Sequence, residues 1–505
     1  MLNVEMLNVT MPNQTMFGTF SILPVNFILD VDSYKVAHKD EYPEDTAYIF
    51  STVVARKPNK FTDKVVVTGH QMNITKYLAG VRVTYEAIDE AEIEITNAGY
   101  DFDRAPWERI IALHGGRLPL EIRCVPEGTV VPVGTAIATI VNTDPELPWL
   151  TSYVETPFQR DMWKGTTVAS ICRAIRVALL EYAEKSGTPL IHVDYCHHNF
   201  GDRGADAHEA AVNAGIPHLL QFEGTDCLQA NRYIKHYFGE TRHHGVSVEA
   251  SEHSVMCSNS NAEERCDFGG FVKMLDRLET ILDKIDKGAK LAPVVSIVID
   301  TYDTYRAVKE FLGTRLKGRI ERLGARGGKV VARPDSGNPI EMPIECINML
   351  MDAFGYTVNE KGYKQLPAYI GVLQGDGINQ ESLRTILNRL DEEKLALGNI
   401  VFGMGGGLTH EAGRDEFSFA MKATARCTKD GVWHDLFKDP ITDIGKRSLK
   451  GRVTTYRTAD GRIFSDRIEL QEVNKQLHDV LETVFLNGDL LIRYDFEQVI
   501  ARARA

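Results

Sequence analysis

The sequence predicts an α/β protein, in which a partly open β/α barrel is combined with an additional α+β domain formed from the N-terminal region and the C-terminal segment. Two observations predict the barrel. From about residue 190 onward, short apolar runs alternate with amphipathic stretches, and five of the loops that follow such runs are rich in Gly, Asp and Arg. Strand, loop and helix units in series are typical of a parallel sheet with helical crossovers.

Seven apolar runs are predicted as the parallel strands of the barrel. They cover residues 190–196, 218–222, 246–248, 294–299, 329–332, 369–373 and 400–402. Helices are predicted between them, including 271–285 and 381–390, because apolar residues recur there at helical spacing. Seven units fit a barrel better than a six-stranded open sheet, but a doubly wound sheet uses the same local pattern and remains an alternative.

The two ends of the chain show a different pattern, which predicts the second domain. Strands are predicted over 47–54 and 130–141, and helices over 71–78 and 83–97. A Lys-Asp-Gly turn at 429–431 is typical of a hairpin, and the segment after it is expected to pack against the first region.

These patterns divide the chain into three parts. Residues 1–25 are predicted as an irregular extension, residues 26–165 together with 425–505 as the α+β domain, and residues 166–424 as the barrel-like catalytic domain. Several Met residues near the start leave the true start codon open.

Composition excludes several classes of protein. The chain of 505 residues carries 57 Lys+Arg against 70 Asp+Glu, a net charge of −13, which argues against a nucleic-acid partner held by a broad basic surface. Eight cysteines without a C-x-x-C pair indicate reduced thiols and a cytoplasmic location. No apolar stretch approaches the length of a membrane span, and the N-terminus lacks the pattern of a signal peptide, so no membrane partner is expected.

The five Gly-, Asp- and Arg-rich loops predict the active site. They are residues 198–204, 223–226, 333–337, 374–377 and 403–407. The carboxyl ends of parallel strands meet at one edge of a sheet, so these loops are expected to bring backbone N–H groups, carboxylates and cations together. Such a set suits a ligand rich in phosphate.

Each loop also has a simpler interpretation when it is taken alone. The Arg-Pro-Asp-Ser-Gly loop at 333–337 is suited to phosphate, ribose and hydrated Mg²⁺, but an ordinary turn with a local ion pair explains it as well. Asp300, which follows the most apolar strand, is either a site carboxylate or the N-cap of the next helix. The glycine run at 403–407 permits close approach of a phosphate or forms a flexible connector.

Two further clusters of residues have a composition found in binding sites. The histidines at 197–198 and 243–244 lack the ligand spacing of a zinc site. The basic residues at 446–452 are suited to an anionic ligand, although a solvated basic loop has the same composition.

Taken in order, the motifs resemble those of the nicotinamide phosphoribosyltransferases, which are type II phosphoribosyltransferases. The resemblance begins at about Phe27 and covers nearly the whole chain. Besides the five loops, it rests on the segments 32–35, 125–128, 142–146, 149–151 and 437–440. It implies that nicotinamide and 5-phosphoribosyl 1-diphosphate give nicotinamide mononucleotide and diphosphate, with help from ATP hydrolysis. It also implies Mg²⁺ and a head-to-tail homodimer with two shared active sites.

The resemblance implies roles for residues around the nicotinamide ring. Phe200 is expected to stack on one face of the ring and the partner subunit's Tyr34 on the other. Asp226 is expected to accept a hydrogen bond from the carboxamide and to repel the carboxylate of nicotinate. Arg203 is expected beside the ring and the ribose phosphate. Asp32 and Ser247 complete the expected substrate-binding set.

The resemblance also implies the catalytic groups. Asp300 and Asp335 are expected to hold ribose hydroxyls and the hydration shell of Mg²⁺, so that the metal is bound through water. His253 matches the histidine that the family phosphorylates from ATP, and neutral imidazole is a competent nucleophile near pH 7.

A larger set is implied for the ribose and the phosphates. It comprises Arg333, Gly375, Asp376, Gly405, Gly406, Arg414, Lys422, Lys438 and Lys446, with Arg56 in trans. This local positive charge explains how an acidic protein holds a highly anionic substrate.

Three positions depart from the pattern of the family. Asp202 stands in place of Tyr, where it affects access to the nicotinamide tunnel, and Met404 and Ala420 each replace a Ser. The loss of the hydroxyl at Ala420 costs about 1 kcal/mol.

Two other functions compete with this interpretation. A nicotinate phosphoribosyltransferase shares the fold, but Asp226 argues against it. A non-catalytic pyridine-nucleotide sensor is the alternative outside the enzymes, against which the retention of His253 argues.

Overall fold

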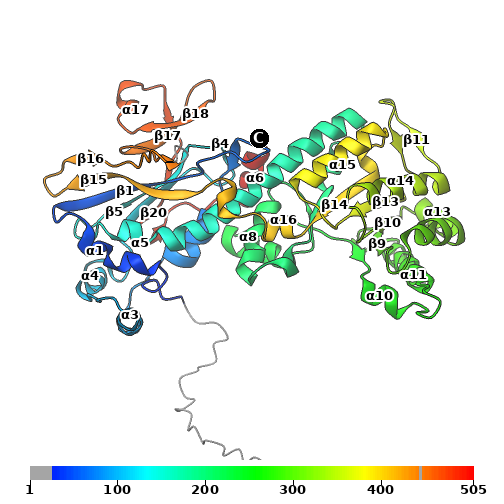
Figure 1. The fold of residues 1–505 in the computed structure, drawn as a ribbon, viewed down its shortest axis with the longest axis horizontal. Coiled ribbons are helices and arrows are strands. Elements are labelled where there is room, and N and C mark those ends of the chain that lie inside the picture. Colours follow the sequence, from blue (N-terminus) through cyan, green and yellow to red (C-terminus); the bar gives the residue numbers. More distant parts are fainter. Residues whose placement is uncertain (1–24, 443–445) are drawn as a thin grey trace, which may run out of the picture.

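The structure, a computed structural model, describes residues 25–442 and 446–505. The predicted extension at 1–25 therefore lies, apart from Val25, outside the described residues. Figure 1 shows two lobes side by side, joined by the long helix α6 (Glu155–Ser186). One lobe contains a parallel sheet and the other an antiparallel sheet.

The parallel sheet has seven strands in the order β7-β6-β14-β13-β10-β9-β8. They are β6 (His197–Asn199), β7 (Gly224–Thr225), β8 (Glu249–Ala250), β9 (Val294–Val298), β10 (Lys329–Arg333), β13 (Ile370–Gln374) and β14 (Ile400–Met404). Val246, just before β8, exchanges backbone hydrogen bonds with the β7 segment: the Thr225 N–H donates to its carbonyl at 2.9 Å, and its own N–H donates to the Glu223 carbonyl at 2.8 Å. The segment 246–250 thus bridges the two edges of the curled sheet, and the predicted barrel-like fold is confirmed.

Three of the seven predicted strands are misplaced. The run at 190–196 contains the short helix α7 (Ile191–Asp194), and its strand begins only at His197. The run at 218–222 holds the end of α8 (His208–His218) and a turn, with the strand following at Gly224. The run at 246–248 precedes the strand at Glu249. Apolar side chains such as Leu219, Leu220 and Phe222 are buried in the core without forming strands, and hydrophobic periodicity does not separate these cases.

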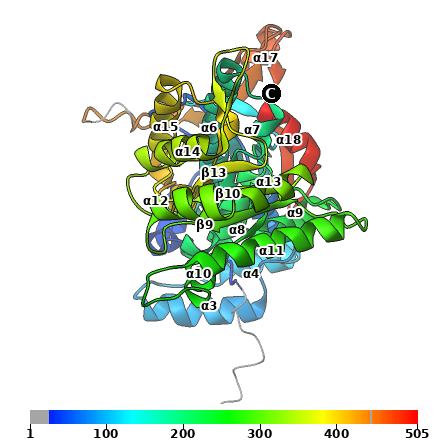
Figure 2. The same cartoon turned by 90° about the vertical axis from the view of Figure 1, so that its right-hand side faces the viewer.

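Helices cover the outside of the curled sheet, and Figure 2 shows several of them beside β9, β10 and β13. They are α8 (His208–His218), α9 (Leu228–Phe238), α10 (His253–Ser258), α11 (Phe268–Ile285), α12 (Thr304–Arg306), α13 (Lys317–Ala325), α14 (Glu341–Phe354), α15 (Gln380–Glu392) and α16 (Gly406–Thr409). The predicted helices at 271–285 and 381–390 are confirmed by α11 and α15. Helix α11 buries Phe271, Leu275, Leu278 and Leu282 against the sheet.

The antiparallel sheet combines both ends of the chain, in the order β16-β15-β1-β5-β3-β20-β21. Its strands are β1 (Thr46–Val54), β3 (Leu120–Cys124), β5 (Ala136–Asn142), β15 (Ala420–Thr428), β16 (Trp433–Asp435), β20 (Glu482–Leu486) and β21 (Asp489–Leu490). Because β15 pairs with β1 and β20 with β3, the C-terminal segment packs against the first region, as the sequence predicts.

Smaller elements complete this lobe. They are β2 (Lys64–Val66), α2 (His70–Asn73), α3 (Tyr85–Asn97), α4 (Ala105–His114), β4 (Val130–Pro132), α5 (Leu150–Tyr153), β17 (Val453–Arg457), β18 (Ile463–Arg467), β19 (His478–Asp479) and α18 (Phe496–Arg504). The single strand predicted at 130–141 is wrong: β4 and β5 are separated by a turn at Gly134, whose φ of +83° favours glycine. The turn at 429–431 does join a hairpin, between β15 and β16.

The predicted domain boundaries fall inside secondary-structure elements: residues 165 and 166 both lie in α6, and residues 424 and 425 both lie in β15.

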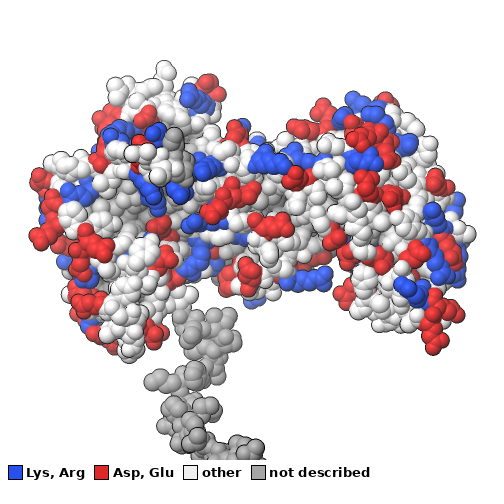
Figure 3. Space-filling view, in the orientation of Figure 1, with Lys and Arg blue, Asp and Glu red and all other residues white. Residues whose placement is uncertain are grey.

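None of the helices in the described part of the chain combines the length and apolar character that crossing a bilayer requires. On the face shown in Figure 3, basic and acidic side chains are interspersed, and no single basic patch covers it.

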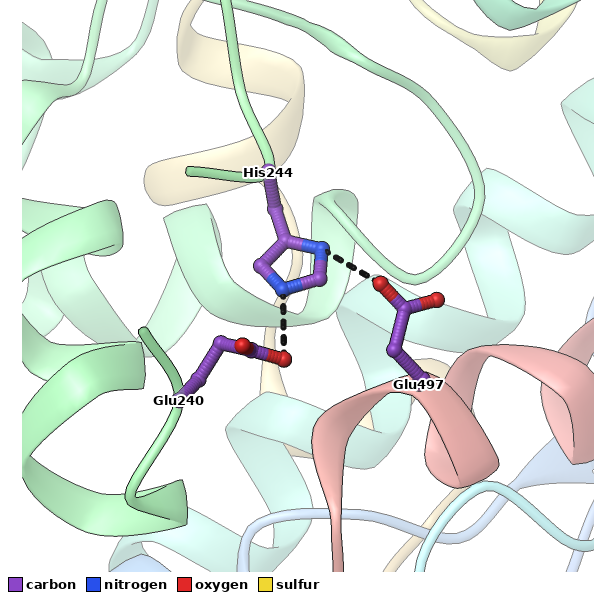
Figure 4. Close-up of side chains that lie close together, drawn as sticks. All are labelled: Glu240, His244 and Glu497. Carbon is purple, nitrogen blue, oxygen red and sulfur yellow. Dashed lines mark ion pairs between the residues drawn. The ribbon is translucent and has the colours of Figure 1, made fainter. Parts of the chain in front are cut away.

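A charged cluster fastens the C-terminal helix α18 to the barrel lobe. The Nε2 atom of His244 lies 3.0 Å from Glu240 Oε2, and its Nδ1 lies 3.7 Å from Glu497 Oε1 (Figure 4). Arg242 also pairs with Glu497. Because the two carboxylates face different nitrogens of the ring, the arrangement fits an ion-paired clamp rather than a metal centre.

Candidate active site

A pocket of about 950 Å³ opens at the carboxyl ends of the parallel strands. It brings together ten of the predicted site residues: Phe200, Arg203, Asp226, His253, Arg333, Asp335, Gly375, Asp376, Gly405 and Gly406. Arg333 is the last residue of β10, and each of the others comes from a loop or helix start after a parallel strand. The strand order thus gathers residues that lie more than 200 positions apart in the chain.

Phe200 explains why two of the loops are rich in glycine. Its backbone N–H donates to the Met404 carbonyl at 2.9 Å, which holds the ring against the next loop. A Cβ atom at Gly403 would lie 2.1 Å from this ring, and one at Gly375 would lie 3.1 Å from it. Gly403 is therefore glycine because the ring of Phe200 lies against it, a reason other than the close approach of a phosphate predicted for this run.

Asp226 is held by both its backbone and its side chain. Its N–H donates to the Asn199 carbonyl at 3.0 Å. Its Oδ1 accepts a hydrogen bond of 2.5 Å from the Ser247 hydroxyl, so Ser247 reaches the site through Asp226. The carboxylate is exposed on the pocket wall.

His253 and Asp300 form a pair at the rim of the pocket. His253 is the first residue of α10, and its Nε2 lies 3.2 Å from Asp300 Oδ1. The imidazole is 46% exposed whereas the carboxylate is 5% exposed, so the pair presents its histidine to the ligand. Asp300 is not the N-cap of the next helix. Asp303 has that role, since its side chain accepts from the Arg306 N–H at 3.0 Å.

Arg333 does not pair with its neighbour Asp335, contrary to the ordinary-turn interpretation. Its Nη2 donates to the Ser251 carbonyl at 2.6 Å, and no ion pair of Arg333 occurs among the described residues. The Ser251 hydroxyl in turn accepts from the Val298 N–H at 2.9 Å. Sequence reasoning missed Ser251, because nothing in its local pattern shows that it positions an arginine 82 residues away.

A second cavity continues the pocket into the barrel. It encloses about 280 Å³ and shares Phe200, Asp226 and Arg333 with the main pocket. Its other end is lined by His192, Tyr195 and Lys329. Burial lowers the pKa values of His198 and Lys329 in its wall. Phe200 and Asp226 thus lie where the open pocket meets a narrow channel.

Eight predicted residues line neither cavity: Asp32, Tyr34, Arg56, Asp300, Arg414, Lys422, Lys438 and Lys446. Asp300 reaches the main pocket through His253. Arg56 and Lys422 line a separate pocket of about 280 Å³ on the antiparallel lobe, together with Arg447. One pocket therefore holds both Arg56, which is expected to act in trans, and Lys422, so a subunit that supplies one of them also supplies the other.

The three departures from the expected pattern have different surroundings. Asp202 is exposed on the wall of the main pocket. Met404 is 1% exposed and lies against Gly407, away from that pocket. Ala420 lines the separate pocket on the antiparallel lobe, beside Arg56 and Lys422, so the missing hydroxyl affects that pocket alone.

Two models of protein families match this chain. The model of the nicotinate phosphoribosyltransferase (NAPRTase) family matches residues 195–488, more than half of the chain. The chain belongs to this family. The model of the nicotinamide phosphoribosyltransferase N-terminal domain matches residues 26–122. Within the NAPRTase family, the match at 195–488 includes the loops that form the main pocket.

Individual relatives agree with this membership. A protein of Xanthomonas campestris pv. campestris (strain 8004) named nicotinamide phosphoribosyltransferase is 37% identical, over 95% of this chain and 98% of its own. One of the same name from Acinetobacter baylyi is 34% identical, over 96% and 97%.

Among solved structures, human nicotinic acid phosphoribosyltransferase has a TM-score of 0.55 at 15% identity, over 94% of this chain and 92% of its own. Nicotinate-nucleotide pyrophosphorylase from Pyrococcus furiosus has a TM-score of 0.57 at 12% identity, over 99% and 97%. At such identities these two show the fold alone.

Proposed function

We propose that the chain is a nicotinamide phosphoribosyltransferase of NAD salvage, which joins nicotinamide to 5-phosphoribosyl 1-diphosphate and releases nicotinamide mononucleotide and diphosphate. The observation that carries the proposal is the Asp226–Ser247 pair next to Phe200, at the junction of pocket and channel. The printed names of the two bacterial relatives support it.

The charge of Asp226 selects the amide. Phe200 offers its face to the pyridine ring, and the carboxylate of Asp226 accepts a hydrogen bond from the carboxamide nitrogen. Nicotinate would bring a second carboxylate to the same spot, and like charges in a confined site repel strongly. A nicotinate phosphoribosyltransferase is therefore the less favoured function, although it shares the fold.

The carboxylates at the rim serve the sugar. The ring nitrogen of nicotinamide attacks C1′ of the ribose as diphosphate leaves, and positive charge grows on the sugar in the transition state. Asp300 and Asp335 stabilise that charge and hold the ribose hydroxyls. Their oxygen atoms are the ligands that Mg²⁺ prefers, so these two carboxylates would hold a hydrated Mg²⁺, which would offset the negative charge of the diphosphate. Arg333, oriented by Ser251, binds the 5′-phosphate.

His253 accepts a phosphoryl group from ATP. A hydrogen bond from its Nε2–H to Asp300 leaves the lone pair on Nδ1 available as the nucleophile. The exposed imidazole at the rim of the pocket supports this role.

A homodimer completes the active site. The ring of Tyr34 is 58% exposed, and the pocket that holds Arg56 and Lys422 belongs to the other lobe, so a second copy can add these groups to the barrel pocket. We also propose a cytoplasmic location, which the eight free cysteines support.

The test is product formation by the purified protein with 5-phosphoribosyl 1-diphosphate and Mg²⁺, offered nicotinamide or nicotinic acid, each with and without ATP. Mononucleotide from the amide alone, stimulated by ATP, is expected. Turnover of the acid instead contradicts the role of Asp226. No turnover of either base favours the pyridine-nucleotide sensor.

A further inference from the structure

A pocket remote from the active site gathers five cationic side chains at the junction of the two lobes. Lys64, Arg173, Arg457, Arg462 and Arg502 line a cavity of about 740 Å³, which we call the arginine pocket. They come from β2, α6, the β17–β18 hairpin and α18. The end of the chain lies near β4 and α6 in Figure 1, and both elements border this cavity. The arginine pocket shares no lining residue with the active-site pocket.

No Asp or Glu lines this cavity, and none of the five cations forms an ion pair with such a side chain among residues 25–442 and 446–505. Asp460, two positions before Arg462 on the hairpin, is the nearby acid that interacts with Arg462 through charge. Other arginines of this protein are heavily paired: Arg104 contacts three carboxylates, and so does Arg389. In a chain with a net charge of −13, five clustered cations without such an ion pair are out of keeping with the rest of the molecule.

Backbone and aromatic contacts hold Arg173 and Arg502 in place. Arg502 donates through Nε to the Glu127 carbonyl at 2.6 Å, and its guanidinium lies 5.3 Å from the ring centre of Tyr494. Arg173 donates through Nη2 to the Ala505 carbonyl oxygen at 3.1 Å. Two nitrogens, Arg173 Nε and Arg502 Nη2, are buried and have no hydrogen-bond partner among the described residues. The positive charge is thus held in position without an ion pair to an Asp or Glu side chain in the described part of the chain.

The remaining wall is apolar and includes an aromatic ring. Val130, Pro132, Ile463 and Phe464 line it, and Arg462 lies 5.5 Å from the ring centre of Phe464. A guanidinium fork binds phosphoryl oxygens with two parallel hydrogen bonds, and an aromatic face stacks on a planar base. The two features occur together in the same cavity.

We propose that the arginine pocket binds a nucleoside polyphosphate, a small molecule with at least two linked phosphoryl groups and a planar base. The five cations match a ligand of three or four negative charges, and the volume is that of a small-molecule site. Arg457 and Arg462, exposed on the hairpin, bind the phosphoryl groups through hydrogen bonds, and Phe464 stacks on the base. This binding is separate from catalysis and does not depend on the proposed function.

Calorimetric titration of the full chain with ATP, tripolyphosphate and AMP, without Mg²⁺, tests the proposal. The variant pair R457A/R462A removes two exposed arginines of the pocket and is expected to weaken one binding event for ATP and for tripolyphosphate by at least about tenfold. A matched control is R319A/R326A, which changes the net charge equally but removes arginines that are paired with acids. The control is expected to bind like the wild type, and AMP is expected to bind at least about tenfold more weakly than ATP.

Three results would overturn the proposal. R457A/R462A binds ATP as tightly as the wild type, or R319A/R326A weakens binding to the same extent, or AMP binds as tightly as ATP. Thermal melting of both variants, with transitions that match the wild type, establishes that each is folded. Unchanged turnover of R457A/R462A separates a loss of this binding from any failure of the active site.

Discussion

The pockets of the two lobes differ in charge. The barrel pocket combines carboxylates and a histidine with Arg203 and Arg333, at one edge of a parallel sheet. The pocket of the antiparallel lobe is lined by Arg56, Lys422 and Arg447 and by no Asp or Glu of the described residues. In the homodimer proposed above, the pocket of the antiparallel lobe of one chain completes the barrel pocket of the other. Each chain then carries parts of an active site that its own fold keeps in two separate pockets.

Among the predicted variants, removal of the Asp300 charge is expected to lower activity the most. The variant D300N keeps the shape of the side chain but loses the charge that faces His253, so kcat/KM is expected to fall by at least about 10³-fold. The control is D303N, the same chemical change three positions later, where Asn still caps α12. Steady-state rates of the two variants decide the matter: equal losses would mean that the loop, and not the carboxylate of Asp300, is what catalysis needs.

Mixing a variant of the antiparallel-lobe pocket with a variant of the barrel pocket tests whether two chains share one active site. R56A and D300N are each expected to be nearly inactive alone. If the cationic pocket of one chain completes the barrel pocket of the other, random mixed dimers contain one intact site, and about a quarter of the wild-type activity returns. The measurement is turnover after the two variants are unfolded and refolded together. Activity no higher than the sum of the separate variants contradicts the shared site.

Lys164 allows a smaller test within the barrel half. This buried lysine of α6 donates to the carbonyls of Thr409 at 2.5 Å and Ala412 at 3.0 Å, and so holds the loop that follows Gly405 and Gly406. Replacing it by Met is expected to lower kcat/KM about 10- to 100-fold, because the glycine loop loses its anchor. Lys185 of the same helix pairs with Asp391 at the surface, and K185M is expected to keep full activity.

Burial lowers the pKa of Lys164 to about 8. Its charged form therefore costs free energy in the fold: the unfolded chain holds this proton more tightly, and the lysine favours folding more as the pH rises from about 8 toward 10. Melting curves across that range are expected to show this rise in the wild type and not in K164M. A rise of the same size in both would assign the effect to another group.

The sequence predicts the sheet edge better than the strands that form it. The sequence predicts the position of loops such as 333–337 correctly, because Gly, Pro and Asp mark the ends of strands by their own backbone chemistry. It misplaces the strands before Phe200 and Asp226, because apolar runs that end in a buried turn look the same as strands. It does not predict contacts between distant positions. The hydrogen bond from Arg333 to Ser251, and the pocket that joins Arg56 to Lys422, depend on which strands pair.

The antiparallel lobe should respond in stability rather than in rate, and Asp144 offers the clearest case. Burial raises the pKa of this carboxyl, but hydrogen bonds from Arg109 and His114 and from the Glu146 N–H outweigh burial and lower the pKa to about 2. The folded-state pKa lies below the usual value near 3.9, so the ionised group stabilises the fold above about pH 4, and this stabilisation is lost as the pH falls through about 2. D144N is expected to lose about 2 kcal/mol at pH 7 and almost nothing near pH 2. Denaturant melts at both pH values measure the difference. A loss of stability that is the same at both pH values would trace the effect to packing, and a loss of kcat/KM in the folded variant would contradict the division of labour between the two lobes.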